Sequence, residues 1–254
     1  MHGGMWGGVL EKLAEHFQVM AVDLPGHGLS GKREEGRGKG ALFGAAVFPF
    51  TLHPSPFTLD TLVDQLSSQF PGPLTVCGWS LGGQLALRWA MRRPAQVDRL
   101  ILVSSTPCFV QRVDWCCAMA AETLADFSAA LQQDYASTLR RFLALQVRGS
   151  EQERELLLAL RQSLRSRGEP DPAALQAGLA ILNDTDLRAA LSEIAQPTLL
   201  VAGERDALTP PAASQYMAEQ MHSGRLATIA GAAHAPFLSH TEEFVKHVVD
   251  FLHE

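Results

Sequence analysis

The stretch CGWSLGGQ, residues 77–84, places one serine between glycines, directly after the apolar run PLTVCG and directly before the helix-like LALRWAMRR. It contains the pattern G-x-S-x-G as GWSLG, residues 78–82. A strand that turns so sharply into a helix leaves no room for side chains at the flanking positions, which explains the glycines. The pattern predicts that Ser80 is a nucleophile at the carboxyl end of a strand, above the N-terminal dipole of the next helix.

Short apolar or β-branched runs alternate with helical patterns along much of the chain, which is typical of a mostly parallel sheet flanked by helices. The predicted strands are FQVMAVD (17–23), LTVCG (74–78), RLILVSS (99–105), PTLLVAG (197–203) and RLATIA (225–230). Residues 112–194 carry amphipathic helical segments instead of strands. We therefore expect an α/β-hydrolase fold with a core of residues 1–111 and 195–254, and a helical cap of residues 112–194 inserted between strands.

Residues 31–57 follow neither the strand pattern nor the helix pattern. They are Gly-rich and charged at first and then apolar without a clear period, and the tetrapeptide PFTL occurs at 49–52 and again at 56–59. We interpret this segment as a loop that contains a small duplication.

The composition narrows the class of protein. At 254 residues and 46% hydrophobic, the chain can form one large domain, and its formal charge of −6 argues against a nucleic-acid partner. Cys77, Cys108, Cys116 and Cys117 have neither CxxC nor metal-like spacing, so we expect reduced thiols and no metal or cofactor. The longest apolar run, residues 41–50, is about half as long as a membrane span needs. Because no secretory signal precedes it, we expect a cytoplasmic protein.

A nucleophilic serine needs a base, and the base needs an orienting acid; on this fold they follow in the order Ser, Asp or Glu, His, each after a later strand. Asp206 comes just beyond the predicted strand 197–203, and His234 just beyond 225–230. Four other groups are alternatives that we interpret as solvated surface side chains: Glu204, His240, Asp184 and Asp186.

These three residues predict an acyl-transfer mechanism. His234 would take the proton of Ser80, whose oxygen attacks an acyl carbonyl, while Asp206 holds the imidazole tautomer. The resulting oxyanion needs two backbone donors, which are the N–H of Leu81 and a second N–H from a loop after an early strand.

Further motifs carry a family resemblance. They are DLPGHGLS (23–30), GWSLGG (78–83), SSTPCF (104–109), RFLALQ (141–146), TDLR (185–188) and AAHAPFLSH (232–240). Together they resemble the BioH family, the pimeloyl-[acyl-carrier protein] methyl ester carboxylesterases of biotin synthesis, over nearly the whole chain apart from 31–57. The resemblance implies a triad of Ser80, Asp206 and His234 that hydrolyses a methyl ester at the far end of a carrier-bound acyl chain, with methanol as leaving group.

The resemblance also implies which residues bind the substrate. They are Ser80, Leu81, Phe142, Leu143, Ala144, Leu145, Gln146 and His234. The alternative for residues 142–146 is a role in the core of the cap, and for Leu143 and Leu145 both roles can hold together.

The cap carries a separate charge signal. Seven arginines and three glutamates give residues 137–167 a charge of +4, whereas the rest of the chain carries −10. An arginine cluster could attract an acidic acyl carrier protein, although an ordinary solvated helix face would look the same. The resemblance implies that Arg141 and Arg154 dock the carrier, and we expect the chain to act as a monomer.

Two other classes of function fit the residues. One is a different activity on the same fold: a short-chain carboxylesterase, a thioesterase or a hydrolase of carbon–carbon bonds. The other is an inactive binding protein that has kept the fold. Haloalkane dehalogenases and epoxide hydrolases are disfavoured, because they carry aspartate where this chain has Ser80.

The first residues of the chain resemble an oxyanion motif that we do not expect them to form. HGGMW, residues 2–6, looks like a His-Gly oxyanion motif, but on this fold that dipeptide ends a strand of about five residues. By the resemblance, Met1 falls just after the family's His-Gly-Trp-Gly turn, so the tryptophan whose N–H completes the oxyanion hole is absent. We expect that the native protein has further strands upstream and that this form is poorly stable and weakly active. If it is not, a backbone amide near Gly3 or Gly4 must act as the second oxyanion donor.

Overall fold

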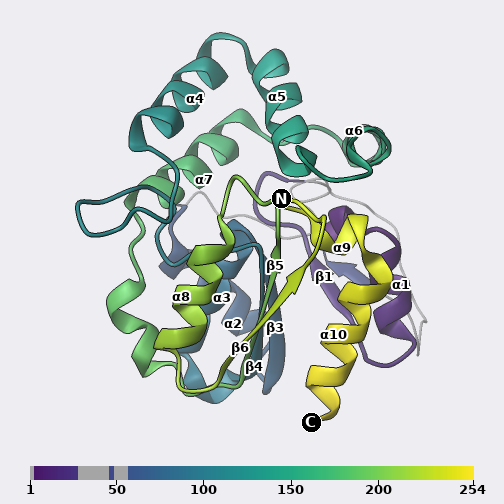
Figure 1. Ribbon diagram of the computed structural model, residues 1–254, viewed down its shortest axis with the longest axis vertical. Helices are drawn as coiled ribbons and strands as arrows, with labels where there is room; N and C mark the ends of the chain where they lie inside the picture. The colour runs from purple at the N-terminus through teal and green to yellow at the C-terminus, as the bar shows by residue number, and fades with distance from the viewer. Residues whose placement is uncertain (1–2, 28–45, 49–56) are drawn as a thin grey trace.

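The computed structural model describes residues 3–27, 46–48 and 57–254. Two parallel sheets run through it, with the orders β1-β2 and β3-β4-β5-β6 (Figure 1). The strands are β1 (Met20–Val22), β2 (Ala46–Phe48), β3 (Leu74–Trp79), β4 (Val97–Val103), β5 (Thr198–Gly203) and β6 (Gly224–Ile229). The five strands predicted from the sequence are confirmed, as is the parallel α/β fold.

The loop predicted for residues 31–57 is wrong at three positions. Ala46–Phe48 form β2, which pairs in parallel with Met20–Val22. The apolar Ala-Val-Phe run gives β1 a hydrogen-bonded neighbour, which a three-residue strand needs in order to persist. The rest of that prediction, including the first PFTL, lies outside the described residues.

Helices enclose the larger sheet on both faces, as buried parallel strands require. The helices of this core are α1 (Gly8–Ala14), α2 (Leu59–Gln69), α3 (Leu81–Arg92), α8 (Pro211–Gln220), α9 (Pro236–Ser239) and α10 (Thr241–His253). Short 3-10 turns are η1 (Gly3–Trp6), η2 (Pro94–Gln96) and η3 (Arg188–Glu193). Helices α2, α3 and α8 cover one face, and α1 and α10 cover the other.

The alternation of side chains along β4 explains the two-sided core. Leu100 and Leu102 point into the cluster with α2, α3 and α8, whereas Ile101 and Val103 point into the cluster with α10. All four are at most 2% exposed. Because the strand has a period of two, an uninterrupted apolar run fills both layers.

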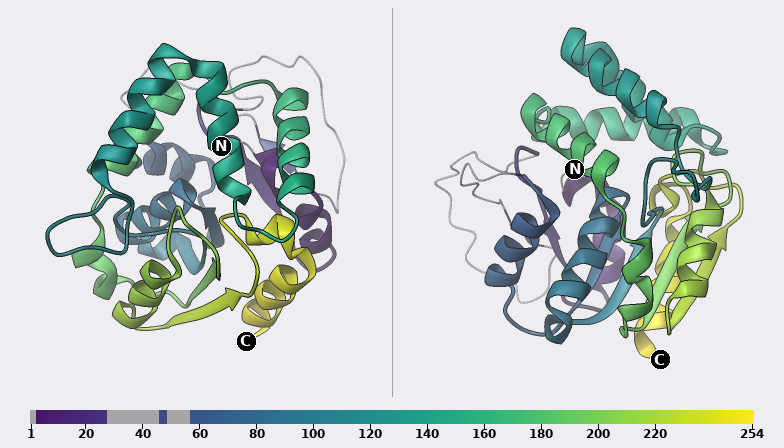
Figure 2. Two further views of the ribbon diagram at one scale, coloured as in Figure 1. Left: turned by 45° about the horizontal axis from the view of Figure 1, so that its top comes forward. Right: turned by 90° about the vertical axis from the view of Figure 1, so that its left-hand side faces the viewer.

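Four helices form a separate layer above the carboxyl ends of the strands (Figure 2). They are α4 (Ala121–Gln133), α5 (Tyr135–Val147), α6 (Glu153–Arg167) and α7 (Pro172–Asp184). Asp171 caps α7 by accepting the N–H of Ala173 at 2.8 Å, and its own N–H donates to the carbonyl of Gly26 at 2.7 Å. A Cβ on Gly26 would lie 2.4 Å from Ala174, so only glycine lets the cap come this close to the core.

The outer edge of β3 borders a second space. Among the described residues, β3 pairs only with β4 and β1 only with β2. Both strands line a cavity of about 510 Å³ together with residues of α3, and Thr75 and Cys77 are exposed there. The four cysteines form no disulfide. In the described part of the chain, no helix is long and apolar enough to cross a membrane.

Candidate active site

Ser80 occupies the turn between β3 and α3 in a strained conformation. Its φ of 54° lies in the left-handed region that non-glycine residues rarely adopt. A Cβ on Gly78 would lie 2.2 Å from the carbonyl oxygen of Gly82, and one on Gly83 would lie 2.2 Å from the Ser105 hydroxyl. Gly78 and Gly83 therefore make room for the turn as predicted, whereas the prediction is wrong for Gly82, where a Cβ would have no atom within 4 Å.

The end of β4 holds this turn in place. The N–H of Ser80 donates to the Val103 carbonyl, and the Ser105 hydroxyl donates to the Ser80 carbonyl, both at 2.9 Å. The Gln84 amide donates to the carbonyl of Thr106 at 3.2 Å. The segment SSTPCF thus supports Ser80 from the end of the neighbouring strand. It has a structural role in addition to matching the family motif.

His234 and Asp206 meet in the loops after β6 and β5. His234 Nδ1 lies 2.8 Å from Asp206 Oδ2 and 3.1 Å from Oδ1, and both side chains are almost completely buried. The loops come this close because residue 203 is glycine: a Cβ there would lie 2.0 Å from the Ala233 carbonyl oxygen. Burial alone would raise the pKa of Asp206, but His234 and the Thr209 donors outweigh it and hold this pKa below its usual value.

Trp79 and Thr209 contact the His234–Asp206 pair, but neither was among the site residues predicted from the sequence. The Trp79 indole N–H donates to the backbone carbonyl of His234 at 2.7 Å, and the two rings are 5.7 Å apart. The Thr209 hydroxyl donates to Asp206 Oδ2 at 2.8 Å. Trp79 stands inside the G-x-S-x-G motif and Thr209 three residues after Asp206, but their partners become apparent only in the folded chain.

Ser80 and His234 line the same cavity, of about 130 Å³, between the sheet and the cap. Among the described residues, no hydrogen bond joins the Ser80 hydroxyl to the His234 ring. Catalytic hydrogen bonds of this kind often tighten only when substrate binds. The structure therefore assembles the His234–Asp206 pair and brings Ser80 to the same space.

Helix α5 supplies one wall of this cavity. Phe142, Leu143, Leu145 and Gln146 line it, whereas Ala144, predicted with them, does not. Residues three and four apart share a helix face, so positions 142, 145 and 146 point together and 144 points elsewhere. Other apolar lining residues, not singled out from the sequence, come from the remaining cap and the loop after β4: Phe109, Leu124, Phe127, Leu175, Leu179 and Leu182.

Gln146 is a polar exception in this apolar wall. It is 1% exposed, and its Nε2 donates to the Phe142 carbonyl at 3.3 Å. Its Oε1 is buried without a hydrogen-bond partner among the described residues. A buried acceptor without a partner is costly, so a donor on a bound molecule would be favoured at this point.

Leu81 begins α3 directly after Ser80 and also lines the cavity. Its N–H lies in the first helical turn, where backbone donors have no partner within the helix. Met5 of η1 reaches the same cavity, and Gly4 accepts a hydrogen bond from the Ser163 hydroxyl at 3.2 Å. The segment of Gly3 and Gly4 thus lies close to the site, and its use as the second donor stays a prediction. Met1 and His2 lie outside the described residues.

Comparison with known proteins shows the family of this chain. The sequence model described as "Alpha/beta hydrolase family" matches residues 1–247. The chain belongs to the alpha/beta hydrolase family. Within this family it is 44% identical to a pimeloyl-[acyl-carrier protein] methyl ester esterase of Nitrosomonas europaea, over 96% of this chain and 89% of that protein. An esterase of the same name from Nitrosospira multiformis is 41% identical, over 99% and 90%. The resemblance stated from the motifs is confirmed.

Solved structures of two esterases have the same fold as this chain. A thermophilic esterase from Thermogutta terrifontis superimposes with a TM-score of 0.76 over 100% of this chain and 86% of its own, at 20% identity. An esterase from Exiguobacterium antarcticum gives 0.73 over 83% and 82%, at 21% identity. At such low identity these likenesses concern the fold alone, which they support.

The alternative acids and histidine have other partners. Glu204 accepts the N–H of Gly231 at 2.9 Å, and His240 contacts the Ser239 hydroxyl at 2.8 Å. Asp186 forms an ion pair with Arg188, and Asp184 accepts from the Asn183 amide. None of the four lines the cavity with Ser80. Of the candidates weighed from the sequence, Asp206 and His234 alone form a pair beside Ser80 in the described structure.

Proposed function

We propose that this chain hydrolyses the methyl ester of a pimeloyl-[acyl-carrier protein], which yields the free carboxylate and methanol in biotin synthesis. The observation that carries the proposal is a buried His234–Asp206 pair that shares an apolar cavity with Ser80. Relatives that are 44% and 41% identical over nearly the whole chain bear the name of this activity.

The first half of the reaction forms an acyl-enzyme. Because Nδ1 of His234 faces Asp206, its Nε2 is the nitrogen that accepts the Ser80 proton. The Ser80 oxygen attacks the ester carbonyl carbon, and the Leu81 N–H stabilises the negative oxygen that forms. The protonated His234 then donates its proton to the methoxy group, which leaves as methanol.

The second half releases the product. Water replaces methanol, gives its proton to His234 and attacks the acyl carbon, and the Ser80 oxygen departs with the proton that His234 returns. Asp206 keeps the imidazole in one tautomer throughout. The buried carboxylate suits this role because its lowered pKa keeps it ionised at neutral pH.

The cavity suits a methylene chain with an ester at its end. Its wall combines the apolar face of α5 with side chains of α4 and α7, and Ser80 and His234 stand on the sheet side. Methylene groups gain free energy when such a surface removes them from water.

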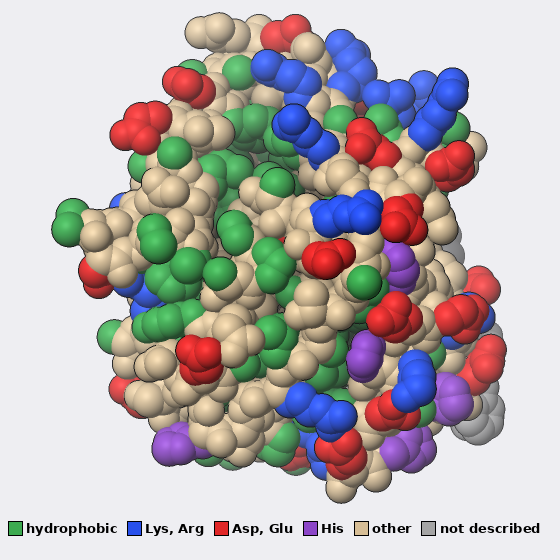
Figure 3. Space-filling view, in the orientation of Figure 1, with side chains coloured by type: hydrophobic (Ala, Val, Ile, Leu, Met, Phe, Trp, Pro, Cys, Tyr) green, Lys and Arg blue, Asp and Glu red, His purple; other side chains and the backbone are tan. Residues whose placement is uncertain are grey.

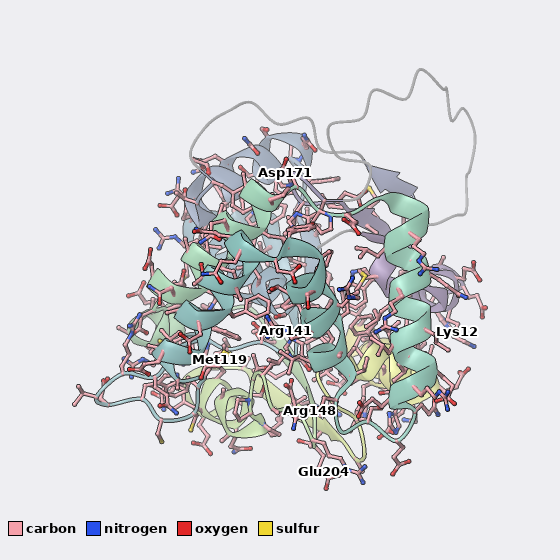
Figure 4. The ribbon with its side chains drawn as sticks, turned by 90° about the horizontal axis from the view of Figure 1, so that it is seen from above. Lys12, Met119, Arg141, Arg148, Asp171 and Glu204 are labelled. Carbon is pink, nitrogen blue, oxygen red and sulfur yellow. The ribbon has the colours of Figure 1, made fainter. Side chains whose placement is uncertain are left out.

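We place the carrier on the exposed arginines of α5 and α6. Figure 3 shows basic side chains gathered at the top of the molecule, over these helices. Arg141 and Arg154 are exposed, as are Arg140, Arg148 and Arg165. Arg141 also donates to the Thr138 hydroxyl at 3.2 Å, and Figure 4 shows it within the cap seen from above. An acidic carrier would be attracted to this surface by long-range charge.

A comparison of three substrates tests the proposal. Purified chain is offered the carrier-bound pimeloyl methyl ester, p-nitrophenyl acetate and a carrier-bound acyl thioester, each also with the Ser80→Ala variant as control. We expect the highest kcat/KM for the methyl ester, with methanol and the free acid as products. Preference for the acetate would indicate a short-chain esterase, preference for the thioester a thioesterase, and either result would overturn the proposal.

A further inference from the structure

We infer that Thr209 is a positioning residue, whose hydroxyl fixes the Asp206 carboxylate so that the His234 ring keeps its Nε2 directed at the nucleophile. This inference rests on the proposed function, because it concerns the same base. It assigns a role to a residue outside the serine, histidine and aspartate.

The Asp206 carboxylate receives donors on both oxygens. Oδ1 accepts the N–H groups of Leu208 at 2.9 Å and Thr209 at 3.0 Å, and Oδ2 accepts the Thr209 hydroxyl at 2.8 Å. His234 Nδ1 lies 2.8 Å from Oδ2 and 3.2 Å from the Thr209 hydroxyl oxygen. Among the hydrogen bonds of the described residues, the Thr209 hydroxyl therefore reaches both members of the pair.

The backbone around Thr209 is built to hold that hydroxyl still. Pro210 and Pro211 follow it, and a residue before proline is restricted to extended conformations. Threonine is also branched at Cβ, which limits its χ1 rotation. Its side chain is 1% exposed, and its hydroxyl has only Asp206 and His234 as hydrogen-bond partners in the described structure.

The Thr209 hydroxyl determines how firmly Oδ2 of Asp206 is held. The backbone donors anchor Oδ1, but without the Thr209 hydroxyl only the histidine itself would hold Oδ2 in place. A carboxylate free to rotate about Cβ–Cγ would let the imidazole tilt, and small misplacements of a base are costly in rate. Hydrogen bonds to a charged acceptor are among the stronger ones, so the hydroxyl contributes appreciably to this geometry.

Nearby charges do not take over this role. Glu204 and Arg205 stand just before Asp206, but Glu204 accepts from Gly231. Arg205 turns toward the α5–α6 loop, where it donates to the Gly149 carbonyl at 3.3 Å. Figure 4 shows this region, with Arg148 at the end of α5 and Glu204 beyond it.

The test compares Thr209→Val, which keeps the shape and removes the hydroxyl, with Thr209→Ser, which keeps the hydroxyl. Thr198→Val is the matched control, because Thr198 is as completely buried and its hydroxyl donates to the Gln196 carbonyl at the start of β5, whereas Asp206 follows the other end of that strand. We measure kcat and KM on the carrier-bound methyl ester, the rate of Ser80 phosphonylation by a fluorophosphonate, and thermal unfolding.

We expect Thr209→Val to lower kcat and the phosphonylation rate about tenfold with KM unchanged, as loss of a hydrogen bond to a charged group implies. Thr209→Ser should restore most of both rates, and Thr198→Val should lower stability alone. Unchanged rates in Thr209→Val, or equal rates in the serine and valine variants, would overturn the inference. If Thr209→Val does not fold, Thr209→Ala takes its place under the same criteria.

The phosphonylation rate separates the two claims. It depends on the same base but on no particular substrate, so a wild-type chain that reacts with the fluorophosphonate yet ignores the carrier-bound ester would sink only the proposed function. Equal phosphonylation of wild type and Thr209→Val would sink only the role of Thr209.

Discussion

The two flanks of Ser80 differ sharply in how completely they are packed. On the side of β4, β5 and β6, the serine backbone is hydrogen-bonded to the end of β4, and His234 and Asp206 are buried and joined. On the side of β1, the edge of β3 faces a cavity of about 510 Å³ in which Thr75 and Cys77 are exposed. His234 is therefore held by many contacts, whereas the β1 side of Ser80 has few within the described part of the chain.

This difference bears on the two tasks of the site. In the proposed mechanism, proton transfer depends on the flank formed by β4, β5 and β6, where the described residues supply named donors to both oxygens of the Asp206 carboxylate. In the same mechanism, stabilisation of the oxyanion depends on donors around the turn between β3 and α3, and among the described residues we assign the Leu81 N–H to this role. We therefore expect the first task to be more robust to substitution nearby than the second.

The largest effect expected is the loss of activity in Ser80→Ala. The substitution removes the nucleophilic oxygen and leaves the packed flank in place, so hydrolysis of the carrier-bound ester should fall by about 10⁴–10⁶. His234→Ala should cost a similar factor. Circular dichroism and thermal unfolding check that both variants fold. More than about a tenth of wild-type kcat in Ser80→Ala would show that a different group is the nucleophile.

A smaller effect is expected at the cap, away from both flanks. Reversing Arg141 and Arg154 to glutamate should raise KM for the carrier-bound ester about tenfold, because the acidic carrier loses its attraction, while a small ester is cleaved as before. Added salt should weaken the wild type in the same way. Lys246→Glu on α10 is the control, since it reverses an exposed charge remote in sequence from the cap. Equal damage to both substrates would instead indicate disturbed cap packing.

The smallest effect expected is a difference in the labelling rate of two cysteines, which tests whether the β1 side of Ser80 is open to small reagents. Methyl methanethiosulfonate is small enough to enter the cavity, so Cys77 should be modified in the folded chain while the buried Cys108 is not. The thiolate is the form that reacts, so the modification of Cys77 should accelerate as the pH rises. Burial raises the pKa of Cys108, which slows the reaction of that thiol further. Equal protection of both thiols, measured by peptide mass spectrometry, would mean that the flank is closed.

The sequence was most informative where a motif and its order constrain each other. G-x-S-x-G with its strand and helix predicted the sharp turn at Ser80, and the order of the strands led to Asp206 and His234, which the structure brings into contact. The apolar runs of the core strands were also clear, because both faces of a parallel sheet are buried.

The remainder depends on contacts between distant segments. Trp79 reaches the carbonyl of His234 across 155 positions, and nothing in the neighbourhood of Trp79 indicates that partner. Thr209 looks like any turn residue before two prolines until the loop of His234 lies against it. The inclusion of Ala144 followed a contiguous motif, whereas a helix presents its residues to a cavity by its own period.

The most direct measurement of the central claim is reaction of the chain with a fluorophosphonate, followed by intact mass and peptide mapping. A serine made nucleophilic by the His234–Asp206 pair predicts a single adduct on Ser80, no adduct in Ser80→Ala and a much slower reaction in His234→Ala. Absence of an adduct in the folded wild type, or an adduct that persists in Ser80→Ala, would contradict the assignment of this site as a serine hydrolase centre.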